Sequence, residues 1–137
     1  MAGGEAQPVS PVDAFLALES ADGAYLYYVE SGQSDGAGLL WRMPLKGGDP
    51  IKLVEGVSSL AFAVVDGGVY YPERAASETR LQYFDFSTHR STTVAGTLGP
   101  LPIGLVGSVT ASRDGRTILF SRVDSSVDDL MLVENFR

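Results

Sequence analysis

The 137-residue sequence contains no cysteine, a single histidine, and fewer basic than acidic residues. Without cysteine, the chain can form no disulfide and offers no thiolate for catalysis or metal binding. Lys and Arg number 10 against 17 Asp and Glu, which gives a formal net charge of −7. Binding to nucleic-acid phosphates needs a basic face, so we expect no nucleic-acid partner.

Long uninterrupted apolar segments are also missing from the sequence. No window approaches the roughly 20 apolar residues that a membrane-spanning helix needs, so we expect no membrane partner. The segment after Met1 has neither the basic start nor the apolar stretch of a signal peptide, and a cytoplasmic location is therefore expected by default. No stretch predicts a helix, since the only short candidate, residues 13–18, is in phase with a repeat of strands.

The clearest pattern that is present is an Asp-Gly pair between two apolar runs. Asp and Gly tolerate the positive φ that tight turns between twisted strands need, so each pair predicts a β-hairpin. Counted from Asp to Asp, the pairs are 44 and 48 residues apart, and this spacing predicts the blades of a β-propeller. The pairs are Asp22-Gly23, Asp66-Gly67 and Asp114-Gly115.

Further strands follow each turn at similar intervals. Residues 3–10 (GGEAQPVS) align with residues 47–54 (GGDPIKLV), and they predict a fourth strand that lacks a unit of its own. The third unit, in turn, lacks a fourth strand. The predicted second strands are 25–30, 69–73 and 118–123, the third strands are 39–45, 81–86 and 129–136, and the fourth strands are 51–55 and 91–96.

The sequence therefore predicts an all-β domain, a β-propeller segment of three four-stranded antiparallel blades. Three blades turn through too little of a circle to close, since propellers have about four to eight. We expect two copies to close a six-bladed ring, with residues 5–9 of each chain added to residues 129–134 of the other. The competing interpretation is that the chain is a fragment of a longer propeller, whose other blades complete the ring. The predicted segments are 1–12 (swapped outer strand), 13–56, 57–98 and 99–137.

The turn sequences resemble the WD-like β-propeller repeats of TolB-type proteins. The signature of that family is Ser-Pro-Asp-Gly-(Lys/Arg), followed by an aliphatic or aromatic strand. Here it stands as Ser-Arg-Asp-Gly-Arg at 112–116 and Ser-Ala-Asp-Gly-Ala at 20–24, with Arg113 and Ala21 in place of proline. The ending DLMLVENFR is similar to the C-terminus of large bacterial regulators that contain such repeats. The resemblance implies the propeller fold and, because its motifs are structural, no particular activity.

Catalytic and metal-binding patterns are scarce. His89, the single histidine, is predicted in a polar turn without partners that would make it a general base or a ligand. No Gly-x-Ser-x-Gly elbow is present to expose a serine nucleophile. The acidic group Asp124, Asp128 and Asp129 lacks the alternating ligands and closing Glu of a calcium loop. We expect no cofactor and no metal.

One end of the blades carries the candidate binding residues. Loops between second and third strands share an end with the blade-to-blade crossings, and the Asp-Gly turns lie at the other end. Propellers often bind ligands at such an end, and the alternative is a charged surface that only keeps the chain soluble. The candidates are Asp35, Glu73, Arg74, Arg80, Asp124 and Asp128, with Glu78 and Asp129 beside them.

The function that these observations favour is a non-enzymatic scaffold for protein binding or self-assembly. The alternative is a hydrolase or lyase of the propeller type, with a site formed at the central channel on oligomerisation. A third interpretation is a remnant of a longer gene without a function of its own.

Overall fold

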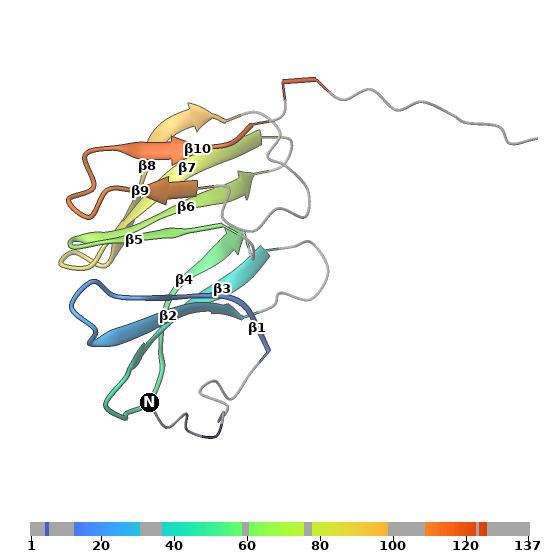
Figure 1. The fold of residues 1–137 in the computed structure, drawn as a ribbon. Coiled ribbons are helices and arrows are strands. Elements are labelled where there is room, and N and C mark those ends of the chain that lie inside the picture. Colours follow the sequence, from blue (N-terminus) through green and yellow to red (C-terminus); the bar gives the residue numbers. More distant parts are fainter. Residues whose placement is uncertain are drawn as a thin grey trace, which may run out of the picture.

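The computed structural model describes residues 5, 13–30, 37–58, 61–75, 78–98, 109–122 and 124–125. Every regular element in these residues is a β-strand, so the predicted all-β fold is confirmed (Figure 1). The described part contains no helix that could cross a membrane. The predicted swapped strand and the third strand of the last unit fall outside the described residues.

The strands form two four-stranded antiparallel units and one strand pair. Within a unit, each strand forms backbone hydrogen bonds with the strand that precedes or follows it along the chain. Unit 1 contains β1 (Ala14–Glu19), β2 (Tyr25–Glu30), β3 (Ala37–Pro44) and β4 (Ile51–Ser58). Unit 2 contains β5 (Ala63–Val65), β6 (Gly68–Ala75), β7 (Glu78–Asp85) and β8 (Arg90–Thr97), and the final pair is β9 (Val109–Ala111) and β10 (Ile118–Phe120).

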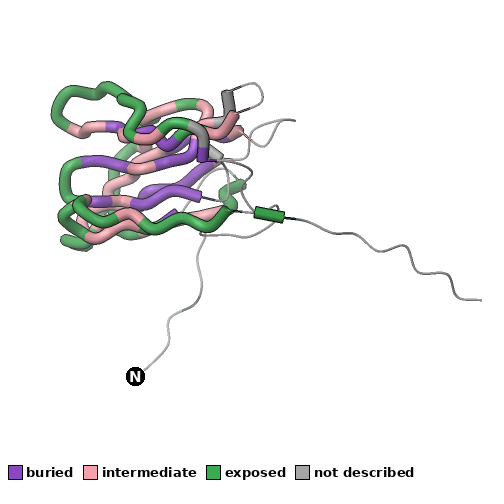
Figure 2. The backbone as a smooth tube through the Cα atoms, turned by 90° about the horizontal axis from the view of Figure 1, so that it is seen from above, coloured by how far each residue is buried: buried purple, intermediate pink, exposed green. Residues whose placement is uncertain are grey.

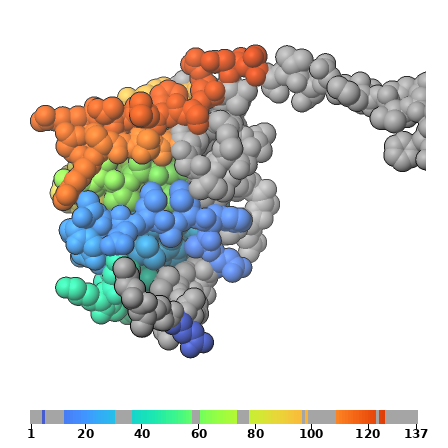
Figure 3. Space-filling view, viewed as in Figure 1, coloured from blue at the N-terminus to red at the C-terminus, as the bar shows by residue number. Residues whose placement is uncertain are grey.

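The two units and the pair are stacked in chain order. Figure 3 shows unit 1 in blue and cyan at the bottom, unit 2 in green above it, and the pair in orange at the top. Units 1 and 2 are connected by a single residue pair, Val57 of β4 with Glu73 of β6. Side-chain packing between the units, rather than a continuous ladder of hydrogen bonds, therefore holds the stack together.

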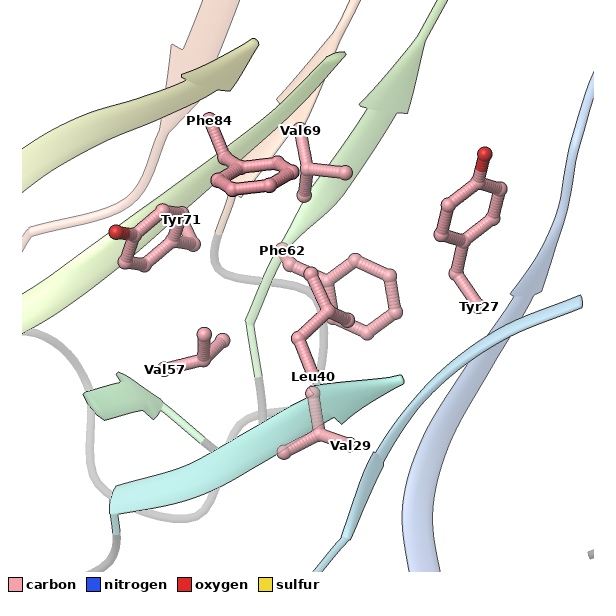
Figure 4. Packing of buried hydrophobic residues seen from close by; sticks show 8 residues of the cluster. All are labelled: Tyr27, Val29, Leu40, Val57, Phe62, Val69, Tyr71 and Phe84. Carbon is pink, nitrogen blue, oxygen red and sulfur yellow. The ribbon is translucent and has the colours of Figure 1, made fainter. Parts of the chain in front are cut away.

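Two hydrophobic clusters occupy the interfaces of this stack. The first lies between units 1 and 2 and includes Phe62, Val69 and Tyr71 (Figure 4). The second lies between unit 2 and the final pair, and Tyr70 packs against it. Alternation along β6 thus sends Val69 and Tyr71 to one cluster and Tyr70 to the other. Unit 2 therefore has buried residues on both of its faces. Figure 2 shows buried segments in purple between exposed turns in green.

Two of the Asp-Gly turns have the same hydrogen bonds. In the first, the Ser20 hydroxyl donates to Asp22 Oδ1 at 2.6 Å and accepts from the Tyr25 amide at 2.9 Å. In the second, the Ser112 hydroxyl donates to Asp114 Oδ1 at 2.6 Å and accepts from the Thr117 amide at 3.0 Å. The glycines that follow have φ of 69° and 70°. In each turn the serine hydroxyl binds the aspartate side chain and one backbone amide. The two turns therefore repeat the same hydrogen bonds as well as the same sequence pattern.

The middle Asp-Gly turn is built differently, and the expected positive φ at its glycine is wrong. Val65 pairs directly with Gly68, so only Asp66 and Gly67 form the loop, and Gly67 is not among the residues with positive φ. This turn lacks the serine that supports the other two. A Cβ on Gly67 would lie 2.9 Å from the Tyr83 hydroxyl, so a side chain at this position would require Tyr83 to shift.

The second Ser-x-Asp-Gly turn gives a direct stability test. Gly115 has φ of 70°, which a β-branched residue adopts only with strain. We expect Gly115→Val to lower the free energy of unfolding by about 1 kcal/mol or more, and Gly115→Asn to cost less because Asn tolerates this conformation. Thermal unfolding followed by circular dichroism measures both, and equal melting temperatures for wild type and Gly115→Val would contradict the assigned turn.

Candidate functional site

The three Asp-Gly turns gather at one end of the stack, at the left in Figure 1. They surround a cleft of about 380 Å³ that is open to solvent. Both units and the final pair contribute to it, so the cleft exists only because the three parts are stacked. Its lining consists of Glu19, Ser20, Ala21, Asp22, Tyr25, Tyr27, Arg42, Val64, Val65, Asp66, Phe86, Ala111 and Arg113.

An ion pair connects two of the turns across the mouth of this cleft. Arg113 Nε donates to Asp66 Oδ1 at 2.9 Å, and the Asp66 amide donates to the Arg113 carbonyl at 3.0 Å. The Asp66 carboxylate raises the pKa of Arg113. Both side chains are largely exposed, so the ion pair contributes little stability. The two contacts connect the turn of the final pair to the middle turn.

Arg42 lies on the wall of the cleft between aromatic rings. Its guanidinium carbon is 4.8 Å from the centroid of the Tyr25 ring and 5.9 Å from that of Phe86. Phe86 in turn stacks on Tyr27, with centroids 5.5 Å apart and planes 14° apart. A cation over aromatic faces is attracted by their quadrupoles, and it loses part of its hydration shell. The arrangement holds the guanidinium in a fixed place at the interface of units 1 and 2.

The Nε atom of Arg42 is shielded from solvent and has no hydrogen-bond partner among the described residues. Burying a polar group without a partner costs free energy. Four other described arginines, by contrast, lie within 4 Å of a carboxylate. These are Arg80, Arg113, Arg116 and Arg122.

Tyr27 is the tyrosine beside this arginine, and its side chain is buried. Burial raises the pKa of Tyr27, and the nearby Arg42 charge acts in the opposite direction. The phenol is therefore neutral at physiological pH.

The described members of the predicted binding set are engaged in local contacts. Glu73 Oε2 accepts from Gln82 Nε2 at 2.7 Å, and Arg80 Nη2 donates to Glu78 Oε2 at 3.2 Å. Asp124 Oδ1 accepts from Arg122 Nε at 2.7 Å. Asp35, Asp128 and the Arg74 side chain lie outside the described residues. The cleft around Arg42 is at the opposite end of the strands from Glu73 and Arg80.

His89 lies in the exposed turn between β7 and β8, as predicted. It has φ of 54°, its amide donates to the Asp85 carbonyl at 2.9 Å, and its ring meets the edge of Phe84. Hydrogen bonds from the Ser87 hydroxyl and the Thr88 amide lower the pKa of Asp85 to about 2. These contacts close the turn. Within the described ranges, no group of three or more His, Asp or Glu side chains is placed to hold a metal ion.

Sequence reasoning missed the cleft because its key contact joins distant segments. Arg42 belongs to the third strand of unit 1, whereas Phe86 follows the third strand of unit 2. The only available signal was the position of Arg42, an isolated cation in the otherwise apolar third strand.

Comparison with known proteins adds no relative: no protein-family model, curated protein or solved structure matches the chain.

Proposed function

We propose that this chain is a three-bladed segment of a β-propeller and that it acts as a non-enzymatic scaffold by self-assembly. Units 1 and 2 and the final pair would be successive blades. The observation that supports this most is the contrast between unit 2, buried on both faces, and the parts at the two ends of the stack, which each have one face without a neighbour among the described residues.

The face of unit 1 that points away from unit 2 is apolar. Cross-strand register places Tyr28 beside Trp41 and Leu26 beside Met43, on the face that points away from unit 2. Tyr28 is 1% exposed and is already covered, whereas Leu26, Trp41 and Met43 are only partly buried. Trp41 Nε1 donates to Glu30 Oε2 at 2.8 Å, so its polar atom is satisfied and its ring remains available for packing.

The free face at the other end is smaller in the described part. Leu119 of β10 pairs with Thr110 of β9 and points away from the second cluster, and it is 65% exposed. Large apolar groups at this position gain about 25 cal/mol per Å² when they are covered. A blade of a second copy supplies such a cover.

Two copies related by a two-fold axis would cover the apolar faces at both ends of the stack. The free face of unit 1 in one chain would meet the last blade of the other, and the same contact would repeat across the axis. Six blades lie within the usual range for closed propellers, and closure leaves no apolar face in water. The proposed role thus follows from the same packing that builds the internal interfaces.

A substitution that introduces a charge on the exposed face of the final pair tests this assembly. We expect Leu119→Asp to convert a dimer into monomer, because the carboxylate would be buried without a partner at each junction. Analytical ultracentrifugation of the full chain measures the change. The matched control is Val94→Asp, since Val94 of β8 is 49% exposed on a strand that is not at a junction. Dissociation of both variants alike, or of neither, would count against the proposed contact.

A further inference from the structure

The cleft contains a cation that has no carboxylate partner among the described residues, although it lies over the Tyr25 and Phe86 rings and beside Tyr27. No carboxylate of the described part lies within salt-bridge distance of Arg42, although the molecule has an excess of acidic residues. Its buried Nε has no hydrogen-bond acceptor either. A guanidinium is well suited to bind a planar carboxylate with two parallel hydrogen bonds. A single anionic group in the cleft would give the guanidinium the charged partner that the described carboxylates do not provide.

The rim of the same cleft has the opposite charge. Glu19, Asp22 and Asp66 contribute carboxylates, against the two guanidinium groups of Arg42 and Arg113. Asp66 is occupied by Arg113, and Asp22 accepts the hydrogen bonds of its own turn. Glu19 is exposed and makes no hydrogen bond or ion pair within the described part. The three carboxylates of the lining outnumber its two guanidinium groups by one, so the lining favours a ligand that carries an ammonium group over a polyanion.

The size and walls of the cleft restrict the ligand further. About 380 Å³ is at the small end of the range for small-molecule sites, roughly 300–1,000 Å³. Tyr25, Tyr27, Phe86 and Val64 provide apolar surface between the charged groups. A small molecule with one carboxylate, one ammonium and an apolar side chain matches all of these features.

We propose that the cleft binds a small zwitterion of the α-amino acid class, with its carboxylate on Arg42 and its ammonium toward Glu19. The aromatic walls contact the side chain of the ligand. All lining residues come from one chain, so each chain binds one ligand whether or not a ring forms. The site is independent of the proposed assembly.

The test is a calorimetric titration of the full chain with each of the standard protein amino acids at millimolar concentration. The tightest binder is then compared with its N-acetyl derivative, which lacks the cation, and its amide, which lacks the carboxylate. We expect each derivative to bind about tenfold or more weakly, since each removes a charge-assisted hydrogen bond. Failure of every amino acid to bind, equal binding of either derivative, or binding of inorganic phosphate alone would overturn the proposal.

Variants assign the two ends of the ligand. Arg42→Gln is expected to abolish binding, and the control Arg90→Gln, which changes an exposed arginine outside the cleft, is expected to retain it. If Arg42→Gln does not fold by circular dichroism, Glu19→Gln takes its place, because Glu19 is exposed and makes no contact that the fold needs. Glu19→Gln should weaken the amino acid about tenfold and leave its N-acetyl derivative unaffected. Unchanged amino-acid affinity in a folded variant of either residue would refute the assignment.

Discussion

We expect Phe62→Ala to lower the free energy of unfolding by about 3–5 kcal/mol, the usual cost of deleting a buried phenyl group. Phe62 is 1% exposed, and Figure 4 shows its ring among Leu40 of unit 1 and Val69 of unit 2. Because only one backbone pair joins the two units, this cluster is their main connection. Removal of the ring would leave a cavity between units 1 and 2. Closing this cavity would require one unit to move relative to the other.

Chemical denaturation of Phe62→Ala provides the measurement, and Phe120→Ala is its control. Phe120 is 44% exposed, so the same deletion there should cost less than about 1 kcal/mol. Similar losses in the two variants would show that the units are not held together by the Phe62 cluster.

The second large effect is expected at Gly68, the first residue of β6. A Cβ at this position would overlap the Phe84 carbonyl oxygen and would lie 2.6 Å from the Tyr83 ring. The carbonyl belongs to a strand held in the β6–β7 ladder, so it cannot move aside alone. We expect Gly68→Ala to destabilise the fold by about 2 kcal/mol or more through overpacking.

Gly96 of β8 offers a matched control for Gly68→Ala. A Cβ on Gly96 would meet no atom within 4 Å, and Gly96 does not have positive φ. Gly96→Ala should therefore leave stability within about 0.5 kcal/mol of wild type. If the denaturation curves of the two variants shift by the same amount, then Gly68 is not as closely packed as the structure shows.

Most of the described fold could be predicted from the sequence because its signals are local. Asp-Gly pairs located the three hairpins, and apolar runs located the strands to within a few residues. The run at residues 25–30 coincides with β2, whereas the run at 118–123 ends at Phe120 in the structure.

The differences arise where tertiary contacts decide the local structure. The middle turn has an Asp-Gly pair like the other two turns. It lacks their serine, and its loop consists of only two residues. Its aspartate then binds Arg113 of the next turn, a contact across 47 positions in the sequence. The Arg42 site has the same origin, since three aromatic residues from two units form it. Neither contact has a local sequence signature.

The most direct test of the proposed ring is the mass of the wild-type chain in solution, measured by light scattering. A two-fold ring predicts a single species at twice the 14.5 kDa of one chain. A monodisperse monomer of 14.5 kDa would contradict the assembly, because the apolar faces at both ends of the stack would then be stable in water.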